Sequence, residues 1–162
     1  MTANRQCEGD AIMEAKPVHD CEQSYAAAFK GTFYGVLRWP QLDELWDVLR
    51  RDETDDWYIY AIGTDAPMTP VTAQQRREFI AEIDVLLRKD HGEDYCGIVY
   101  TDSFEQPSFV KIFDPHNLGV SCGFSDNPPL PGWTLSKLMP VDLMAPSLPG
   151  NRRRWWQRLF GA

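Results

Sequence analysis

Two segments with helical periodicity alternate with runs of strand-forming residues between residues 33 and 114, and this order restricts the fold more than any other feature. The first helical segment follows Pro40, which suits the first turn of a helix. The second follows Thr72 and Gln75, which have the spacing of a capping box. In both segments the apolar residues recur on one helical face: Leu42, Leu45, Trp46 and Leu49, then Phe79, Ile80, Ile83, Leu86 and Leu87.

Four runs rich in aromatic and β-branched residues, at 33–39, 57–63, 95–101 and 108–114, are typical of strands. The last two are joined by a short polar linker, which predicts an antiparallel hairpin. The order β-α-β-α-β-β predicts one α+β domain, with a mixed sheet of about four strands and two helices on one face.

The chain has 162 residues, which is one domain's length with additional segments. Residues 1–24 lack periodicity and are expected to be a poorly ordered leader before the α+β domain of 25–127. Residues 128–150 hold six prolines, which predicts an irregular, extended segment packed partly on the domain. Residues 151–162 form a basic and aromatic tail.

Charge and composition exclude several classes of protein. The net charge of −8 argues against general nucleic-acid binding, which needs basic residues to neutralise phosphates. No apolar run suits a secretion signal or a membrane-spanning helix, and the four cysteines have no disulfide or metal-ligand spacing, so a reduced, cytoplasmic protein is expected. The histidines are far apart and no phosphate-binding motif occurs, so we expect neither metal nor cofactor.

One segment carries residues with catalytic chemistry. Cys122 follows His116 by six positions and Asp114 by eight, and a thiol with an imidazole and a carboxylate could form an activated nucleophile. The same residues also suit a structural turn, because Asp-Pro-His-Asn and the following glycines favour irregular backbone. No local signature of a cysteine enzyme is present, which favours the turn.

The tail is the most unusual segment. Four arginines lie in 151–162, whereas residues 1–150 hold the other twelve basic residues and all 24 acidic ones, a net charge of −12. Asn151 and Gly161 are the expected cap and end of a short helix. On that helix the apolar stripe of about 140° has Arg152 at its opening and the other arginines around the rest. The residues expected to bind a partner are Arg152, Arg153, Arg154, Trp155, Trp156, Arg158, Leu159 and Phe160.

Such a short helix is marginal alone in water, so it needs a surface that accepts its rings. Three surfaces remain open: the chain's own acidic domain, a groove on a partner protein, or an anionic membrane, to which binding would be weak. The proline-rich linker from Pro140 to Asn151 could span about 34 Å, which favours an external target.

These observations favour a non-catalytic accessory or adaptor protein whose tail engages a partner protein. A small thiol-dependent or redox-responsive protein that uses Cys122, His116 and Asp114 is one alternative. A peripheral membrane-surface protein anchored by the tail is the other.

Overall fold

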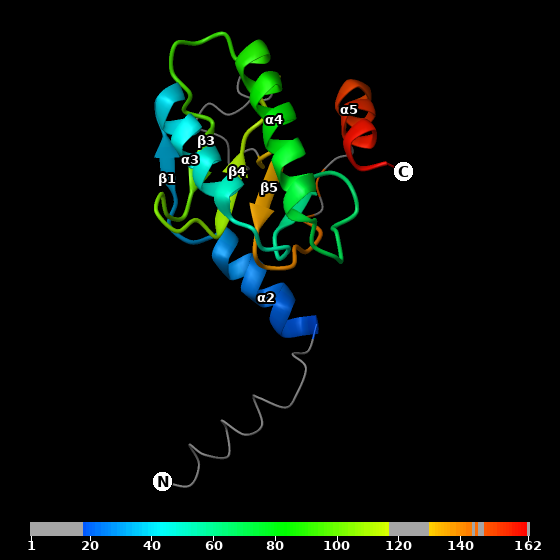
Figure 1. The fold of residues 1–162 in the computed structure, drawn as a ribbon. Coiled ribbons are helices and arrows are strands. Elements are labelled where there is room, and N and C mark those ends of the chain that lie inside the picture. Colours follow the sequence, from blue (N-terminus) through cyan, green and yellow to red (C-terminus); the bar gives the residue numbers. More distant parts are fainter. Residues whose placement is uncertain (1–17, 117–129, 144, 146–147, 162) are drawn as a thin grey trace, which may run out of the picture.

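The computed structural model describes residues 18–116, 130–143, 145 and 148–161. These residues form one five-stranded sheet with helices around it (Figure 1). The elements follow the chain as α2 (Val18–Phe29), β1 (Tyr34–Val36), α3 (Trp39–Arg51), β2 (Tyr58–Ala61), α4 (Ala73–Asp90), β3 (Val99–Thr101), β4 (Phe109–Ile112), β5 (Trp133–Ser136) and α5 (Gly150–Phe160).

The sheet has the strand order β1-β3-β4-β5-β2, and all four pairings are antiparallel. The α+β class is therefore confirmed, as is the hairpin of β3 and β4, but the sheet is not mixed. Helices α3 and α4 connect strands that are not neighbours, since β1 and β2 lie at opposite edges and β3 pairs with β1. A helix between two strands produces parallel pairing only where those strands lie side by side in the same direction.

The fifth strand, β5, lies within the segment 128–150 that was predicted to be irregular. Its four residues, Trp133 to Ser136, alternate apolar and polar side chains and pair with β4 on one side and β2 on the other. Pro131 and Pro140 stand outside the strand, so its backbone donors stay available to the sheet. A four-residue alternation between prolines is too short to be distinguished from a loop by its pattern.

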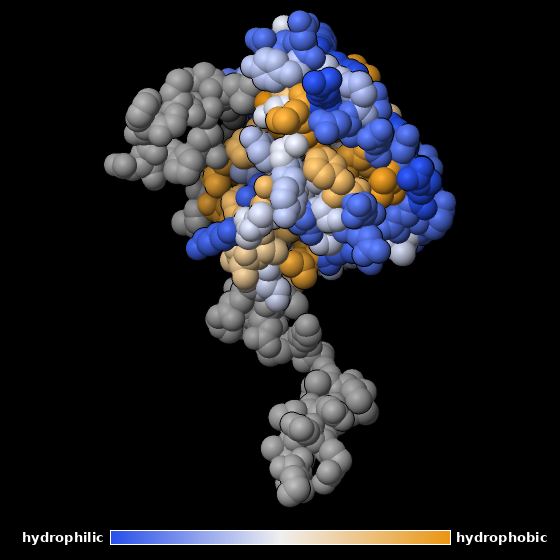
Figure 2. Space-filling view, turned by 90° about the vertical axis from the view of Figure 1, so that its left-hand side faces the viewer, coloured by the Kyte–Doolittle hydropathy of each residue, from blue (hydrophilic) through white to orange (hydrophobic). Residues whose placement is uncertain are grey.

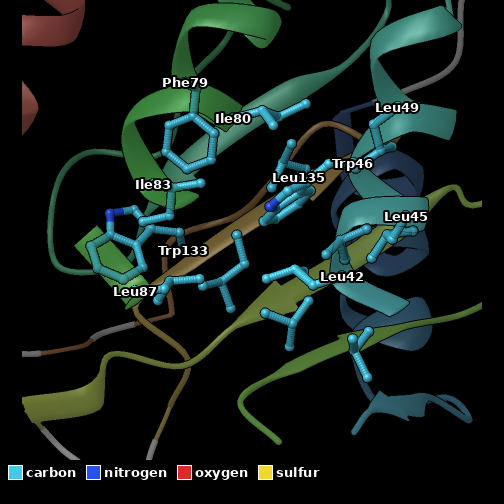
Figure 3. Close-up of a cluster of buried hydrophobic side chains, with 14 of the residues drawn as sticks. Leu42, Leu45, Trp46, Leu49, Phe79, Ile80, Ile83, Leu87, Trp133 and Leu135 are labelled. Atoms are coloured by element: carbon cyan, nitrogen blue, oxygen red, sulfur yellow. The ribbon is translucent and has the colours of Figure 1, made fainter. Parts of the chain in front are cut away.

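The main core lies between one face of the sheet and helices α3 and α4 (Figure 3). The capping box of Thr72 and Gln75 is present at the start of α4, and both predicted helical stripes are buried. Figure 3 shows Phe79 and Ile83 of α4 beside Trp133 of β5, at the opposite end of the core from Leu45 of α3. Helix α5 packs at the end of the core that holds Phe79 and Trp133.

The opposite face of the sheet is covered by α2. The predicted arrangement, with two helices on one face, therefore lacks this third helix. The Tyr25 hydroxyl lies 2.9 Å from the Thr134 hydroxyl, and the Tyr25 ring packs on Phe109 with centroids 5.1 Å apart. Helix α2 begins at Val18, within the segment 1–24 predicted as a leader; residues 1–17 lie outside the described part of the chain. The sequence around α2 shows no regular apolar stripe, so it did not predict that this helix packs on the second face of the sheet.

Candidate functional site

Helix α5 lies alongside α4, and its ribbon stands apart from the sheet (Figure 1). It begins at Gly150, one residue before the predicted cap, and ends where predicted, at Gly161, whose φ of 76° suits glycine. Its apolar face, defined here as Trp155, Trp156, Leu159 and Phe160, is partly buried against the main core.

Aromatic contacts centre on Phe79 of α4. Its ring centroid lies 6.1 Å from that of Trp155, 6.2 Å from that of Trp156 and 6.3 Å from that of Phe160. Trp155 also meets the buried Trp133 of β5 edge-on, at 5.6 Å. Ring pairs at such separations add to the gain from burial alone. Of the three surfaces considered for the tail, the structure therefore shows the chain's own domain.

Arg152 lies on the inner side of α5 and is 6% exposed. Its guanidinium donates two hydrogen bonds to the Asp114 carboxylate, at 2.8 and 2.9 Å, and a third to Asp90, at 2.9 Å. On a helix of 100° per residue it lies between Trp155 and Trp156. Arg152 is thus paired within the domain, and its predicted role in binding a partner stays a prediction.

The two carboxylates come from elements that are distant in sequence. Asp90 is the last residue of α4, and Asp114 follows β4 by two positions. Gly132, just before β5, makes room for Asp114: a Cβ at this glycine would lie 3.3 Å from the Asp114 Cβ. The ends of a helix and a strand, together with a close backbone approach, thus place both carboxylates around the Arg152 guanidinium.

The electrostatics of this cluster favour the charged pair. Burial acts to raise the pKa of the Asp114 carboxyl, but hydrogen bonds from Arg152 and from the His116 backbone N–H outweigh it, so the pKa is lowered. Hydrogen bonding to Asp114 raises the pKa of Arg152 against the opposing effect of burial. Removal of Arg152 would leave the buried Asp114 carboxylate uncompensated, which is costly, whereas removal of Asp114 would leave Arg152 paired with Asp90.

The outer face of α5, defined here as Arg153, Arg154 and Arg158, is exposed to solvent. Arg158 lies 3.4 Å from Glu82 of α4, with both side chains well exposed. Within the described residues, Arg153 and Arg154 take part in no ion pair. The tail thus presents positive charge to solvent and keeps its rings against the domain.

Two of the three residues of the predicted catalytic group, Asp114 and His116, lie within the described residues. Cys122 lies outside the described residues, so its position relative to the others is not tested. The Asp114 carboxylate binds Arg152 and accepts only the backbone N–H of His116, at 2.9 Å. The His116 ring faces Asp90 instead, with Nε2 3.3 Å from the carboxylate. Asp114 therefore orients the arginine and does not contact the imidazole.

Other candidate chemistry is limited in the part of the chain that the structure describes. There, no group of three or more His, Cys, Asp or Glu side chains is arranged to hold a metal ion. Cys96 is buried, and burial raises the pKa of its thiol, which disfavours the reactive thiolate. Among the same residues, none of the helices has the length and apolar character needed to cross a membrane.

A second exposed surface lies at the free edge of β1. Tyr34 and Leu37 are 53% and 63% exposed there, and Tyr95 is 56% exposed. Figure 2, which looks onto this side, shows hydrophobic residues as separate spots among hydrophilic ones. Scattered apolar side chains of this kind are normal on protein surfaces.

Sequence reasoning missed the residues that hold α5 in place. Asp90 and Phe79 were predicted only as the end and the buried stripe of α4, and Trp133 only as part of an irregular segment. The excess of acidic residues in the domain was the available signal, since a buried arginine needs carboxylate partners. Nothing in the spacing indicates which of the 24 acidic residues would supply them.

Comparisons of the chain with protein-family models, with curated proteins and with solved structures found no match.

Proposed function

We propose that this chain is a non-catalytic accessory or adaptor protein of the cytoplasm that binds an acidic surface of a partner protein through the outer face of α5. The observation that carries the proposal is the division of α5 into two faces. The apolar face and Arg152 attach the helix to the domain, and Arg153, Arg154 and Arg158 point to solvent.

A docked helix is a better binding element than a free one. A disordered tail must be ordered when it binds, and that cost subtracts from affinity. Here the aromatic contacts and the Arg152 hydrogen bonds have already ordered the backbone of α5. Arginine is enriched among the residues that dominate binding energy, since its planar group donates two parallel hydrogen bonds to a carboxylate.

The docked position also favours a protein over a membrane as the target. Membrane-surface helices insert Trp, Phe and Leu into the acyl boundary, whereas the rings of α5 pack on Phe79 and Trp133. Residues 1–150 carry a net charge of −12, so an anionic bilayer would repel them. A thiol-dependent activity remains the alternative that depends on Cys122.

The test is charge reversal of the outer face with a charge-matched control. The variant R153E/R154E/R158E and the control K30E/R38E/R51E change the net charge equally, and all six side chains are exposed. We expect the first variant to lose co-purification with the partner from native extract, and the control to retain it. Equal capture by both variants would contradict the proposal, as would equal loss if both remain folded by circular dichroism.

A further inference from the structure

We propose that the groove between α4 and α5 receives one large apolar side chain from an acidic segment of the partner protein. This inference rests on the proposed function and specifies the partner's chemistry. In this groove the arginine-bearing side of α5 adjoins Val85, an exposed apolar residue of α4.

The size of the groove suits a side chain. Its volume is about 270 Å³, and its lining includes Val85, Leu86 and Trp155. Pockets that bind whole small molecules are larger, at roughly 300–1,000 Å³. A single apolar side chain is within the size that this groove admits.

Val85 supplies exposed apolar surface to the lining of the groove. It is 64% exposed on α4, beside the buried Leu86 and the half-buried Trp155. An exposed β-branched residue contributes little to helix stability, since such residues lose rotamer freedom in helices. An apolar side chain placed in the groove would cover Val85 and the remaining exposed part of Trp155.

The charges around the groove select an acidic occupant. Lys89 and Arg158 line it and are exposed, and Arg154 adds charge from the outer face of α5. The negative lining residue Asp90 is already bound to Arg152, and Glu82 contacts Arg158 across an exposed 3.4 Å. Carboxylates flanking an apolar anchor would displace only this weak surface contact, since exposed ion pairs contribute little.

The experiment uses two short synthetic peptides, rich in glutamate and fluorescein-labelled, which differ only in a central Phe or Ala. Binding to the full chain is measured by fluorescence anisotropy. Burial of a phenylalanine side chain should favour the Phe peptide by about tenfold or more. We expect R153E/R154E/R158E to weaken both peptides, because both depend on the arginines for their carboxylates.

Val85→Gln removes apolar surface from the groove without adding charge, and Leu37→Gln is the matched control at the β1 edge, 63% exposed. We expect Val85→Gln to reduce the preference for the Phe peptide at least severalfold, and Leu37→Gln to leave it unchanged. The inference is overturned if neither peptide binds, if both bind the wild type equally, or if the two variants behave alike.

These outcomes are distinct from failure of the proposed function. Partner capture that survives charge reversal of the outer face would contradict the function itself. Partner capture that is lost on charge reversal, with no preference between the peptides, would leave the outer face as the binding surface and remove the groove from it.

Discussion

The two terminal helices of the described structure, α2 and α5, cover opposite faces of the same sheet but are attached by different chemistry. Helix α2 is held by a neutral hydrogen bond between the Tyr25 and Thr134 hydroxyls, and by Lys111, which donates to the Phe29 carbonyl at 2.6 Å. Helix α5 is held by a buried charged pair and by rings around Phe79.

The two attachments differ in how closely they fix the position of a helix on the domain. A neutral hydrogen bond contributes about 1 kcal/mol, and the apolar surface around it can shift without a large penalty. A buried arginine has a defined set of acceptor positions, so Arg152 sets the position of α5 on α4 closely. The face of α5 opposite Arg152 is thereby also oriented, and that face carries the three exposed arginines.

Among the variants that test this comparison, removal of the Arg152 side chain should lower the free energy of unfolding the most. Arg152→Ala leaves the buried Asp114 carboxylate unpaired, and we expect a loss of about 3–5 kcal/mol in the free energy of unfolding, measured in urea. Arg154→Ala on the outer face is the control and should change stability by less than about 0.5 kcal/mol.

A double-mutant cycle identifies the source of that loss. Arg152→Ala combined with Asp114→Ala should destabilise the protein less than the sum of the single variants, because the buried Asp114 carboxylate is then absent and only the partly exposed Asp90 loses its arginine. Additive losses, or equal losses for Arg152→Ala and Arg154→Ala, would show that the charged pair does not hold α5.

The pH dependence of α5 docking is the second largest effect. The folded state lowers the Asp114 pKa below its ordinary 3.8, so the pair's contribution is complete above about pH 4 and is lost as the pH falls through the lowered value. Arg152 binds this carboxylate and also Asp90, which the His116 ring faces. Because the Arg152 pKa is raised, no corresponding loss is expected on the alkaline side.

Urea unfolding of the wild type and of Arg152→Ala/Asp114→Ala at a series of pH values measures how the contribution of the Arg152–Asp114 pair to stability depends on pH. The stability difference between them should be constant at neutral pH and should shrink only in acid. A difference that grows on acidification would have the wrong sign for a carboxyl with a lowered pKa.

The α2 attachment should give a smaller effect. Tyr25→Phe removes one buried neutral hydrogen bond and leaves the Thr134 hydroxyl without it, which we expect to cost about 1 kcal/mol in urea unfolding. Tyr34→Phe, at an exposed site on β1, is the control and should be neutral. If Tyr25→Phe proves as costly as Arg152→Ala, the contrast between the two helices fails.

The smallest effect is expected at the surface contact between α4 and α5. Glu82→Ala removes the carboxylate 3.4 Å from Arg158, where both side chains are well exposed. Exposed ion pairs contribute about 0–1 kcal/mol, so the unfolding midpoint should be nearly unchanged. A loss comparable to that of Tyr25→Phe would show that this contact, and not only Arg152, positions α5.

Much of the fold could be predicted from local patterns. The stripes of α3 and α4, the capping box at Thr72 and the hairpin of β3 and β4 each depend on residues close together in the chain. Strand β5, which lies between β4 and β2, and the role of α2 could not be predicted, because their partners lie far away in sequence. Tyr25 and Thr134, for example, are separated by 109 positions.

The candidate site was predicted only in part, because its local features follow from neighbouring residues but its long-range contacts do not. The amphipathic character of the tail follows from its own residues, and its exposed arginines are among those named from the sequence. The carboxylate partners of Arg152 could not be predicted, because a helical wheel gives angular positions but no acceptors. Asp90 and Asp114, which bind it, come from the ends of α4 and β4.

The sequence by itself determined that this chain makes an α+β domain followed by a short helix with one apolar and one basic face. Local periodicity and capping are sufficient for that. Only the tertiary structure decided that the apolar face rests on Phe79 and Trp133 and that one arginine of the four is buried. The reason is physical: a buried charge is stable only beside opposite charges, and these are brought together by folding.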